Sequence, residues 1–318
     1  MTVAVVGASG FIGRAVVSDL EAAGQEVRRI SGLRVSGEID PRTMSVFGDP
    51  KSRGAIRDAI EGCHCVINAA GDPNASSTDQ TALLQANALL PGLLAEAVSD
   101  VPGARFVHVS SAVVQGRAAM LTDSDEFDVF SPYAVSKAEG ERAIRRACPE
   151  RHVIYRPPSV HAPDRRVSRS VVRLAESPLR SVAAPPTSPS PQALVENVAS
   201  AIAFLATCTP EPPSVVIHPW EGMTTGGLMR VLGGREPRVL PQRFASRIVQ
   251  LLERAGRRSG PIATNARRVE MMWFGQGQDR SWLTGAGWTP PVGIEGWEEL
   301  RMRIKTEAAR GDMGGTDD

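Results

Sequence analysis

The 318-residue sequence has little of what would place it in several common classes of protein. Its net charge is only +1 and it has no stripe of aromatic and basic residues, which argues against a nucleic-acid partner. It has no apolar run of 18 residues and no signal-like segment before the first expected strand, so we expect a soluble, cytoplasmic protein without a membrane partner. Only four cysteines occur, without a second paired cluster. We therefore interpret Cys63-His64-Cys65 as the start of a strand and expect no metal, with a zinc site as the alternative.

Tyrosine and lysine are also scarce, since the chain has two tyrosines and three lysines beside 33 arginines. One of each stands in the segment SPYAVSKAEGE, where Tyr133 and Lys137 are four residues apart. On a helix this spacing places both side chains on one face. Because an ammonium has a tunable pKa and a guanidinium does not, the spacing predicts a proton-transfer pair. An amphipathic helix with one exposed lysine is the alternative.

The amino-terminal segment predicts a strand, a tight turn and an amphipathic helix. The apolar run VAVV leads into a turn with three glycines, and the helix ends at Gly24. Gly7 permits the turn, Gly10 lets backbone N–H groups approach a pyrophosphate, and Gly13 allows the helix to lie close to the strand. The motif predicts dinucleotide binding, with a purely structural turn as the alternative. The residues assigned to this binding are Gly7, Ser9, Gly10, Phe11, Ile12 and Gly13.

The tip of the second expected strand, EVRRI, bears on the choice between NAD and NADP. An acidic side chain usually accepts from the adenosine ribose here when the cofactor is NAD, but this chain has Ser31 and Gly32. With Arg29 and Arg34 close by, the site suits a 2′-phosphate better. We therefore predict NADP, with NAD as the alternative, and assign Ser31 and Arg34 to its binding. The other interpretation of Arg34 is a side chain on a solvated loop.

Two further strand ends contribute candidate cofactor residues. The run SVFGD ends in Asp49, which could accept from the adenine amino group or simply form the turn before Pro50. The run CHCVINAAG is typical of a buried strand, and it ends in small residues that leave room for a ligand. Ala69, Ala70 and Gly71 are therefore expected to line the path of the dinucleotide.

The next helix and strand bring polar residues toward the same place. The segment TDQTALLQANALLPGLLAEAVS has helical periodicity, and Pro91 is expected to kink it near Asn87. The following strand, RFVHVSS, ends in Ser110 and Ser111. Because open parallel sheets bind ligands at the carboxyl ends of their strands, we expect these serines and Tyr133 to meet the glycine turn at one crevice.

Taken in order, these motifs resemble a known family across most of the chain. GASGFIG, INAAG, QANALLPGLLAEA, VHVSSAVVQG, PYAVSK and YRPPSVHAP occur as in extended short-chain dehydrogenases/reductases, within the NAD-dependent epimerase/dehydratase group. VENVASAIAFLA and LTGAGWTPPVGIEGWEELR resemble later elements of the same family. The resemblance implies an α/β fold with a doubly wound parallel sheet of the Rossmann type. The alternation of expected strands and helices predicts the same fold class.

The resemblance also implies catalytic roles. Ser111, rather than Ser110, matches the catalytic serine because the turn AVVQG follows it, and Tyr133 and Lys137 match the acid/base pair. Free tyrosine titrates near about 10, so a nearby ammonium and the positive nicotinamide ring would favour its ionisation. Tyr133 would then exchange a proton with the substrate oxygen while the nicotinamide gives or takes hydride.

Other positions match the family or depart from it. By the resemblance Asn87 and Pro157 join the cofactor-binding residues, although Asn87 could equally be a capping or packing residue at the kink. Gln115 and His161 stand where the family often has tyrosine, which puts a standard sugar epimerase in doubt. His161 could contact substrate, or be a merely solvated loop residue. Tyr155, in the strand HVIYRPP, is most simply a core residue.

The expected organisation is a nucleotide-binding domain over residues 1–155, with residues 190–208 returning to it. A smaller α/β substrate-binding portion would comprise residues 156–189 and 209–305, and residues 306–318 would form a flexible polar tail. Basic residues in the loop and helix after residue 156 are candidates for contact with a substrate diphosphate, or else form a solvated basic face. They are Arg165, Arg166, Arg169, Arg173 and Arg180.

Three functions follow from these observations. The first is an NADP-dependent reductase that acts on a keto group of a nucleotide-linked sugar or similar small molecule. The second is a nucleotide-sugar 4-epimerase that holds NAD tightly, and the third is a non-catalytic NADP-sensing or scaffold protein. The set of Ser111, Tyr133 and Lys137 favours an enzyme, and the absence of an acid at Ser31 favours the reductase. By the resemblance, helices at 79–99 and 131–147 would form the interface of a homodimer.

Overall fold

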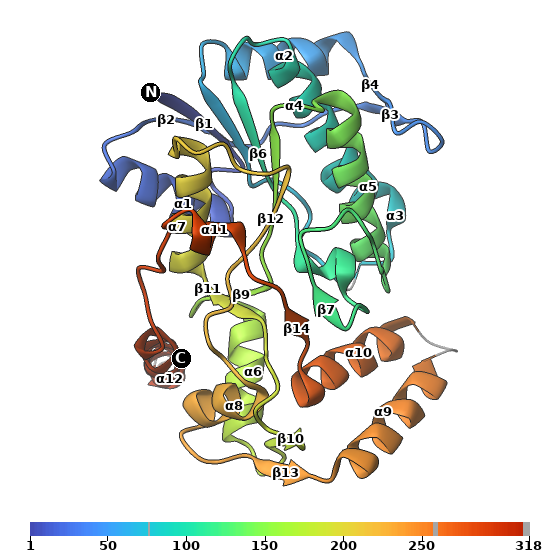
Figure 1. Cartoon of the computed structure of the whole chain (residues 1–318), viewed down its shortest axis with the longest axis vertical. Helices are drawn as coiled ribbons and strands as arrows, with labels where there is room; N and C mark the ends of the chain where they lie inside the picture. The colour runs from blue at the N-terminus through green and yellow to red at the C-terminus, as the bar shows by residue number, and fades with distance from the viewer. Residues whose placement is uncertain (76, 257–259, 314–318) are drawn as a thin grey trace. The chain divides into compact units, whose positions relative to one another are not determined.

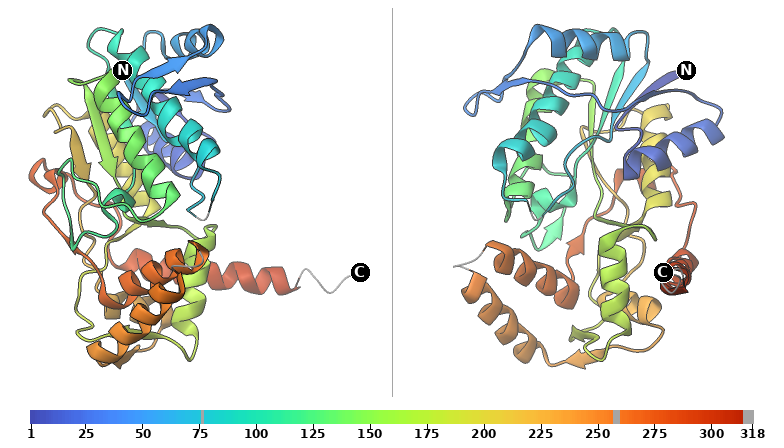
Figure 2. Two further views of the ribbon diagram at one scale, coloured as in Figure 1. Left: turned by 90° about the vertical axis from the view of Figure 1, so that its right-hand side faces the viewer. Right: turned by 180° about the vertical axis from the view of Figure 1, so that it is seen from behind.

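A computed structural model describes residues 1–75, 77–256 and 260–313 of the chain. The chain divides into two compact units, each made of segments that are distant in the sequence (Figures 1 and 2). Unit 1 comprises Met1–Pro158, Glu196–Pro219 and Arg280–Thr289. Unit 2 comprises Ser159–Val195, Trp220–Asp279 and Pro290–Asp318.

Unit 1 is built on a six-stranded parallel sheet with the strand order β12-β8-β6-β5-β1-β2 (Figure 1). The chain order reverses between β1 and β5, which are paired neighbours. Open α/β sheets bind ligands outside the carboxyl ends of the strands at such a reversal. The predicted α/β, doubly wound fold is therefore confirmed. The strands are β1 (Thr2–Val6), β2 (Glu26–Ile30), β5 (Cys65–Asn68), β6 (Arg105–Val109), β8 (His152–Arg156) and β12 (Val215–Ile217).

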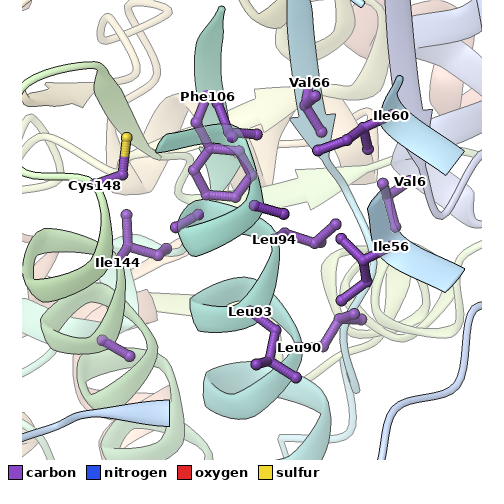
Figure 3. Close-up of a cluster of buried hydrophobic side chains, with 14 of the residues drawn as sticks. Val6, Ile56, Ile60, Val66, Leu90, Leu93, Leu94, Phe106, Ile144 and Cys148 are labelled. Atoms are coloured by element: carbon purple, nitrogen blue, oxygen red, sulfur yellow. The ribbon is translucent and has the colours of Figure 1, made fainter. Parts of the chain in front are cut away.

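Helices cover both faces of this sheet (Figures 1 and 2). α2 (Pro50–Ile60), α4 (Leu90–Ser99) and α5 (Pro132–Ala147) lie on one face, and α1 (Phe11–Ala22) and α7 (Val195–Thr207) lie on the other. Figure 3 shows the apolar layer beneath the first group, where Phe106 of β6 packs near Leu94 of α4 and Ile144 of α5. All three side chains are fully buried. Their burial fixes α5 against the strands and so positions its amino-terminal turns at the ligand-binding edge.

A short antiparallel hairpin stands apart from the main sheet. Its strands β3 (Gly37–Ile39) and β4 (Val46–Gly48) pair with each other. Val46 is buried in the core cluster, whereas the side chain of Phe47 is 57% exposed on the other side of the strand. The expected strand before Asp49 therefore exists, but it leads into α2 from the hairpin and not from the main sheet. Unit 1 also contains the 3-10 turn η2 (Ala112–Gln115), β7 (Met120–Leu121) and α11 (Trp282–Gly285).

The helix expected over residues 79–99 is present and contains a π-helical segment. α3 (Gln80–Leu84) continues through the π segment η1 (Gln85–Leu89) into α4. Pro91 gives the reason, because proline has no N–H to donate to the Asn87 carbonyl four residues earlier. The N–H of Leu90 donates to the carbonyl of Gln85, five residues back, as in a π helix. The distortion that the structure shows at Pro91 is therefore a π segment.

The same helix, Gln80–Ser99, is long and apolar enough to cross a membrane by composition, with a mean hydropathy of 1.3. Polar residues interrupt this helix, so the sequence has no uninterrupted apolar run of 18 residues here. In the structure 61% of its most apolar window is buried within the protein. Contacts with α2, α5 and β6 account for that burial. The core helices of globular proteins are buried in the same way.

Unit 2 has an apolar core of its own. Its helices α6 (Arg166–Glu176), α8 (Thr225–Gly233) and α12 (Glu295–Met313) enclose the buried side chains of Met229, Leu232 and Trp297. Two short parallel strand pairs join distant parts of the unit. They are β9 (Ser159–His161) with β11 (Gln192–Leu194), and β10 (Ser181–Ala183) with β13 (Arg238–Leu240). Helices α9 (Gln242–Gly256) and α10 (Gly260–Phe274) pack together, and β14 (Gly277–Gln278) follows them.

The division into units differs from the expected domains in its details. The first segment of unit 1 ends at Pro158. The unit also includes Glu196–Pro219 and Arg280–Thr289, and the sequence pattern places the latter in the substrate portion. Ser281 Oγ donates to the carbonyl of Ile217 in β12, and Trp288 Nε1 donates to Ser200 Oγ in α7 at 3.2 Å. These hydrogen bonds attach the late segment to the sheet edge, and contacts of such long range leave no local sequence pattern.

Residues 306–313 of the expected tail continue α12, which ends at Met313, and the flexibility of the tail stays a prediction. Trp297, Leu300 and Ile304 are buried on one face of this helix at spacings of three and four residues. Such anchors stabilise the helix, and Ala308 and Ala309 then extend it with high helix propensity. Residues 314–318 lie outside the described residues.

Candidate active site

The glycine turn between β1 and α1 forms the first part of the site. The N–H groups of Gly7 and Ala8 both donate to the carbonyl of Ile30, at the tip of β2. Gly7 has a φ of +82°, and a Cβ there would lie 2.6 Å from Ala70 N. A Cβ at Gly13 would overlap Gly7 O. These two glycines therefore bring the turn, the tip of β5 and α1 together, as the sequence motif predicts.

Gly10 has a different environment. A Cβ at Gly10 would meet only Gly7 O, at 3.0 Å, so the protein itself does not require glycine here as strictly. Gly10 is also the N-cap of α1 and offers no side-chain oxygen to the first-turn N–H groups. A helix of this length with an uncapped first turn suits a bound phosphate. The residues present therefore fit the pyrophosphate of a dinucleotide, with Ser9, Phe11 and Ile12 along the same turn.

The two arginines near the tip of β2 differ in their contacts with the rest of the protein. Arg29 is held by Glu21, with Nη2 2.7 Å from Oε1. Arg34 is exposed, and in the described part of the chain its guanidinium has no ion pair or hydrogen bond that holds it. Ser31 is also exposed, directly after the Ile30 carbonyl that receives the glycine turn. Arg34 and Ser31 are therefore the side chains at this tip that could meet a 2′-phosphate.

Asp49 is the N-cap of α2. Its Oδ1 accepts from Ser52 N at 2.6 Å, and Pro50 begins the helix. Hydrogen bonds from Ser52 hold the pKa of this carboxyl below its usual range. Capping alone accounts for an aspartate before a proline, because the carboxylate satisfies a first-turn N–H group. A contact with adenine remains a prediction.

The tip of β5 is fixed by a buried amide and imidazole. Asn68 Oδ1 accepts from Ala70 N at 3.1 Å, while Asn68 Nδ2 lies 3.1 Å from His108 Nδ1 on the neighbouring strand. Ala69 N donates to the carbonyl of Val6 and keeps the tip beside β1. Ala70 thus lies next to Gly7, which agrees with its expected place on the path of the dinucleotide.

Gly71, Asn87 and Lys137 converge although they come from three separate segments. A Cβ at Gly71 would lie 2.7 Å from Asn87 Oδ1 and 3.3 Å from Lys137 Nζ. Asn87 Oδ1 accepts from Asp72 N at 3.0 Å, and Asn87 Nδ2 donates to Ser136 Oγ at 3.0 Å. Asn87 is therefore a bridge between the loop after β5 and α5. Asn87 lies in a π segment beside Pro91. This position is consistent both with cofactor binding and with a packing role at the kink, the two interpretations of Asn87 from the sequence.

Lys137 is the buried cation of the site, with 6% of its surface exposed. Its Nζ donates to the carbonyl of Val109 at 3.3 Å, at the end of β6. Burial lowers its pKa from the usual value to about 8, although the carboxylates of Glu141 and Asp72 oppose the shift. An ammonium has three donors, so it can still donate to a ligand at this edge. Tyr133 lies one helical turn earlier on α5.

The structure separates the two candidate serines. Ser110 is buried, and its Oγ donates to Glu141 Oε1 at 2.6 Å. Ser111 is only half-buried, and its Oγ accepts from Val113 N at 3.3 Å as the cap of η2, which packs against α5. The hydroxyl hydrogen of Ser111 can therefore point to a ligand, which supports its choice over Ser110. Pro157, at the end of β8, accepts from Ala112 N at 2.9 Å and holds the same turn.

Glu141 and Arg156 form a buried ion pair that we did not anticipate from the sequence. Arg156 Nη2 lies 2.7 Å from Glu141 Oε2, and neither side chain is exposed. Arg156 Nη1 also donates to the carbonyl of Ser124 at 2.7 Å. Two signals were available in the sequence: the four-residue spacing of Glu141 from Lys137, and an arginine at the end of the apolar strand HVIYR.

The two positions that depart from the family pattern have partners within the protein. Gln115 is buried, and its side chain accepts from Thr122 N and donates to Glu126 O, so it organises the loop before α5. In unit 2, His161 is buried, with Nε2 2.8 Å from Gln192 Oε1 and Nδ1 3.1 Å from Ser168 Oγ. Burial lowers its pKa to about 4. It is therefore not a merely solvated loop residue.

The candidate diphosphate contacts of unit 2 also fall into two groups. Arg169 pairs with Glu307, and Arg180 donates to the carbonyls of Ser177 and Glu236. These two arginines thus have roles in the protein itself. Arg166 and Arg173 are exposed, and Arg165 is half-buried. A contact of any of them with substrate remains a prediction.

The family assignment from the motifs is confirmed by comparison with known proteins. The sequence model of the NAD dependent epimerase/dehydratase family matches residues 3–186, which is more than half of the chain. The chain therefore belongs to the NAD-dependent epimerase/dehydratase family.

Particular relatives and structures are also similar to this chain. A dTDP-6-deoxy-L-talose 4-dehydrogenase (NAD(P)(+)) of Kitasatospora kifunensis is 34% identical over 153 residues, covering 46% of this chain and 47% of the relative. A 4-hydroxy-2-methyl-3-oxo-4-farnesyl-3,4-dihydroquinoline-1-oxide ketoreductase of Stigmatella aurantiaca is 29% identical, covering 45% of each. The chain thus spans about half the length of the curated relatives it matches. The crystal structure of the human epimerase family protein SDR39U1 with NADPH shares the fold, with a TM-score of 0.66, 17% identity and coverage of 95% of this chain and 99% of the other.

Proposed function

We propose that this chain is an NAD(P)-dependent oxidoreductase that reduces a keto group on a nucleotide-linked sugar or a similar small molecule. The observation that carries the proposal is the buried ammonium of Lys137, which lies at Gly71 and Asn87 and one helical turn from Tyr133. Family membership and relatives named as a dehydrogenase and a ketoreductase support it.

The residues would divide the chemistry as follows. The nicotinamide, when bound, supplies the hydride that goes to the carbonyl carbon. Tyr133 gives a proton to the carbonyl oxygen, and Ser111 donates a hydrogen bond to the same oxygen. The Lys137 ammonium favours the phenolate that Tyr133 becomes, and it has donors left for the cofactor ribose. Hydride and proton together convert the ketone to an alcohol, so electrons and charge balance.

We propose NADP as the physiological cofactor, with NAD as the alternative. Ser31 stands at the tip of β2 where an acid would accept from the ribose, and the exposed Arg34 can meet a 2′-phosphate. The catalytic residues are Ser111, Tyr133 and Lys137. The glycine turn, Ser31, Arg34, Asp49, Asn87, Pro157 and Ala69 to Gly71 would hold the cofactor, together with Tyr133 and Lys137.

We also propose a cytoplasmic homodimer. The four cysteines, all described, are unpaired, which suits a reducing compartment. The dimer would form through the helices over residues 79–99 and 131–147, and α5 presents Val135 there, 41% exposed.

Replacement of Tyr133 by phenylalanine tests the proposed reaction. The variant should keep cofactor affinity and lose about 100- to 10,000-fold in kcat, because the proton donor is gone. Turnover is followed by NADPH oxidation and by product analysis against a panel of keto compounds that includes nucleotide-linked ketosugars. Tyr155→Phe is the matched control, since Tyr155 is the other tyrosine and its hydroxyl is buried against His218. Equal turnover in wild type and Tyr133→Phe would contradict the proposal, and turnover without net NADPH oxidation would favour the epimerase.

A further inference from the structure

A buried ionic cluster lies one helical turn beyond Lys137. Glu141 accepts from Arg156 at both oxygens, at 3.0 and 2.7 Å. Ser110 Oγ donates to Oε1 at 2.6 Å, and Arg145 Nη2 lies 3.2 Å from Oε2. The side chain of Glu141 is completely buried. These hydrogen bonds hold the carboxylate in one orientation inside the protein.

Stability alone is a weak reason for such an arrangement. Two ions removed from water lose their hydration, and apolar side chains of similar size often stabilise a core as well or better. Arg156 also holds the carbonyl of Ser124 in the loop before α5, yet a neutral hydrogen-bonding group could do the same. The pairing with Arg156 therefore does not explain why position 141 carries a full negative charge. A second charged group, whose protonation depends on that charge, would explain it.

Lys137 is that partner. Residues four apart on a helix are neighbours, so Lys137 and Glu141 lie one above the other on the inner face of α5. The other titratable groups around Lys137 are Tyr133 on α5, His108 on β6 and Asp72 after β5. His108 stays neutral, because burial and Lys137 hold its pKa well below the usual value. Asp72 is only half-buried, so Glu141 is the fully buried negative charge of this group.

We propose that Glu141 is a positioning residue of the proton-transfer site, whose fixed carboxylate keeps Lys137 in its ammonium form beside Tyr133. The inference rests on the proposed function. Burial favours the neutral amine, which could neither stabilise the Tyr133 phenolate nor serve as a cation toward the cofactor. The negative charge of Glu141 opposes that tendency, and Arg156 and Ser110 hold the carboxylate in place.

The test is a direct titration of Lys137 in the protein without cofactor. The chain has only three lysines, so protein labelled with [13C]lysine gives three Cε signals, and Lys51 and Lys305 serve as exposed references. A Lys137→Arg variant assigns the buried signal. In wild type, the pKa of Lys137 should be about 8, because burial disfavours its ammonium form. In Glu141→Gln its midpoint should fall by about one pH unit or more, because a buried unit charge has been removed nearby.

Glu139→Gln is the matched control. It removes a carboxylate from the same helix, but Glu139 pairs with Arg142 toward the surface and should leave the Lys137 midpoint unchanged. In the enzyme, Glu141→Gln should lose kcat/KM at a lower pH than wild type, since Lys137 gives up its proton earlier, while Glu139→Gln keeps the wild-type profile.

Glu141→Gln could unfold the protein, because it leaves Arg156 buried without its anion. The double variant Glu141→Gln, Arg156→Met removes both charges of the pair and provides a folded background for the same titration. A Lys137 midpoint that stays at the wild-type value in a folded Glu141→Gln variant overturns the inference. In the double variant the reference is Arg156→Met alone, and a midpoint that Glu141→Gln does not lower in that background overturns it as well. That result would leave the proposed function standing, whereas an active Tyr133→Phe variant would remove the function without altering the titration.

Discussion

Arg29 and Arg34 have the same side chain but differ in whether the guanidinium is already held by an ion pair. Arg29 is tied to Glu21 by hydrogen bonds from Nε and Nη2, and Arg34 is exposed five residues later. The sequence places both near the ribose. Only the structure distinguishes the two arginines, because Glu21, the partner of Arg29, lies on α1. Whether Glu21 can reach Arg29 depends on how α1 packs against β2.

The two arginines give a test of cofactor choice. Arg34→Ala should weaken NADPH binding by about 10- to 100-fold, the effect of losing a charge-assisted contact to a phosphate, and should leave NADH affinity unchanged. Arg29→Ala is the matched control and should alter neither. Fluorescence titration with both nucleotides measures the effect. An equal loss for NADH and NADPH, or tighter binding of NADH by the wild type, would argue against NADP.

Glycine decides how closely α1 approaches the sheet. A Cβ at Gly13 would overlap the backbone of Gly7, whereas a Cβ at Gly54, within α2, would meet no atom within 4 Å. Both glycines lie within helices, so their helix propensities are comparable. The difference between them is the proximity of the strand–turn segment to α1.

The effect of an added methyl group should therefore have opposite signs in the two helices. Gly54→Ala should raise the free energy of unfolding by about 0.5–1 kcal/mol through helix propensity. Gly13→Ala should lower it by at least about 2 kcal/mol, because the backbone of the turn must move, and should also reduce cofactor affinity. Urea unfolding followed by circular dichroism gives both values. A stabilised Gly13→Ala variant would show that α1 is not held against the turn as described.

The helix over residues 79–99 shows how an element can be predicted while its detail is not. Apolar periodicity and Pro91 indicated a kinked helix. The widening into a π segment depends on the neighbouring helix as well, because a Cβ at Gly140 of α5 would overlap the carbonyl of Asn87. A glycine at position 140 thus lets α5 approach the carbonyl that Pro91 leaves without its usual donor.

At the scale of the whole molecule, the proposed dimer has a direct test. The wild-type protein should sediment with the mass of two chains, because the proposed interface would bury Val135, which is 41% exposed on α5. Val135→Glu should give the mass of one chain, since a carboxylate cannot be buried in that interface without a partner. Val167→Glu is the control, because Val167 is exposed to a similar degree, 39%, on α6 of unit 2. A wild-type mass of one chain would contradict the dimer.

The sequence by itself determined the family, the doubly wound fold, the glycine turn and the helix that carries Tyr133 and Lys137 one turn apart. Each of these depends on spacings within one strand, turn or helix, where local periodicity reports geometry. The tertiary structure showed that Ser110 donates to Glu141 whereas Ser111 caps η2, that Arg29 is paired whereas Arg34 is exposed, and that Glu141 and Arg156 form a buried pair. It also joined Arg280–Thr289 to unit 1 and extended the final helix to Met313. Such contacts arise between residues that only strand order and helix packing bring together, so no local pattern records them.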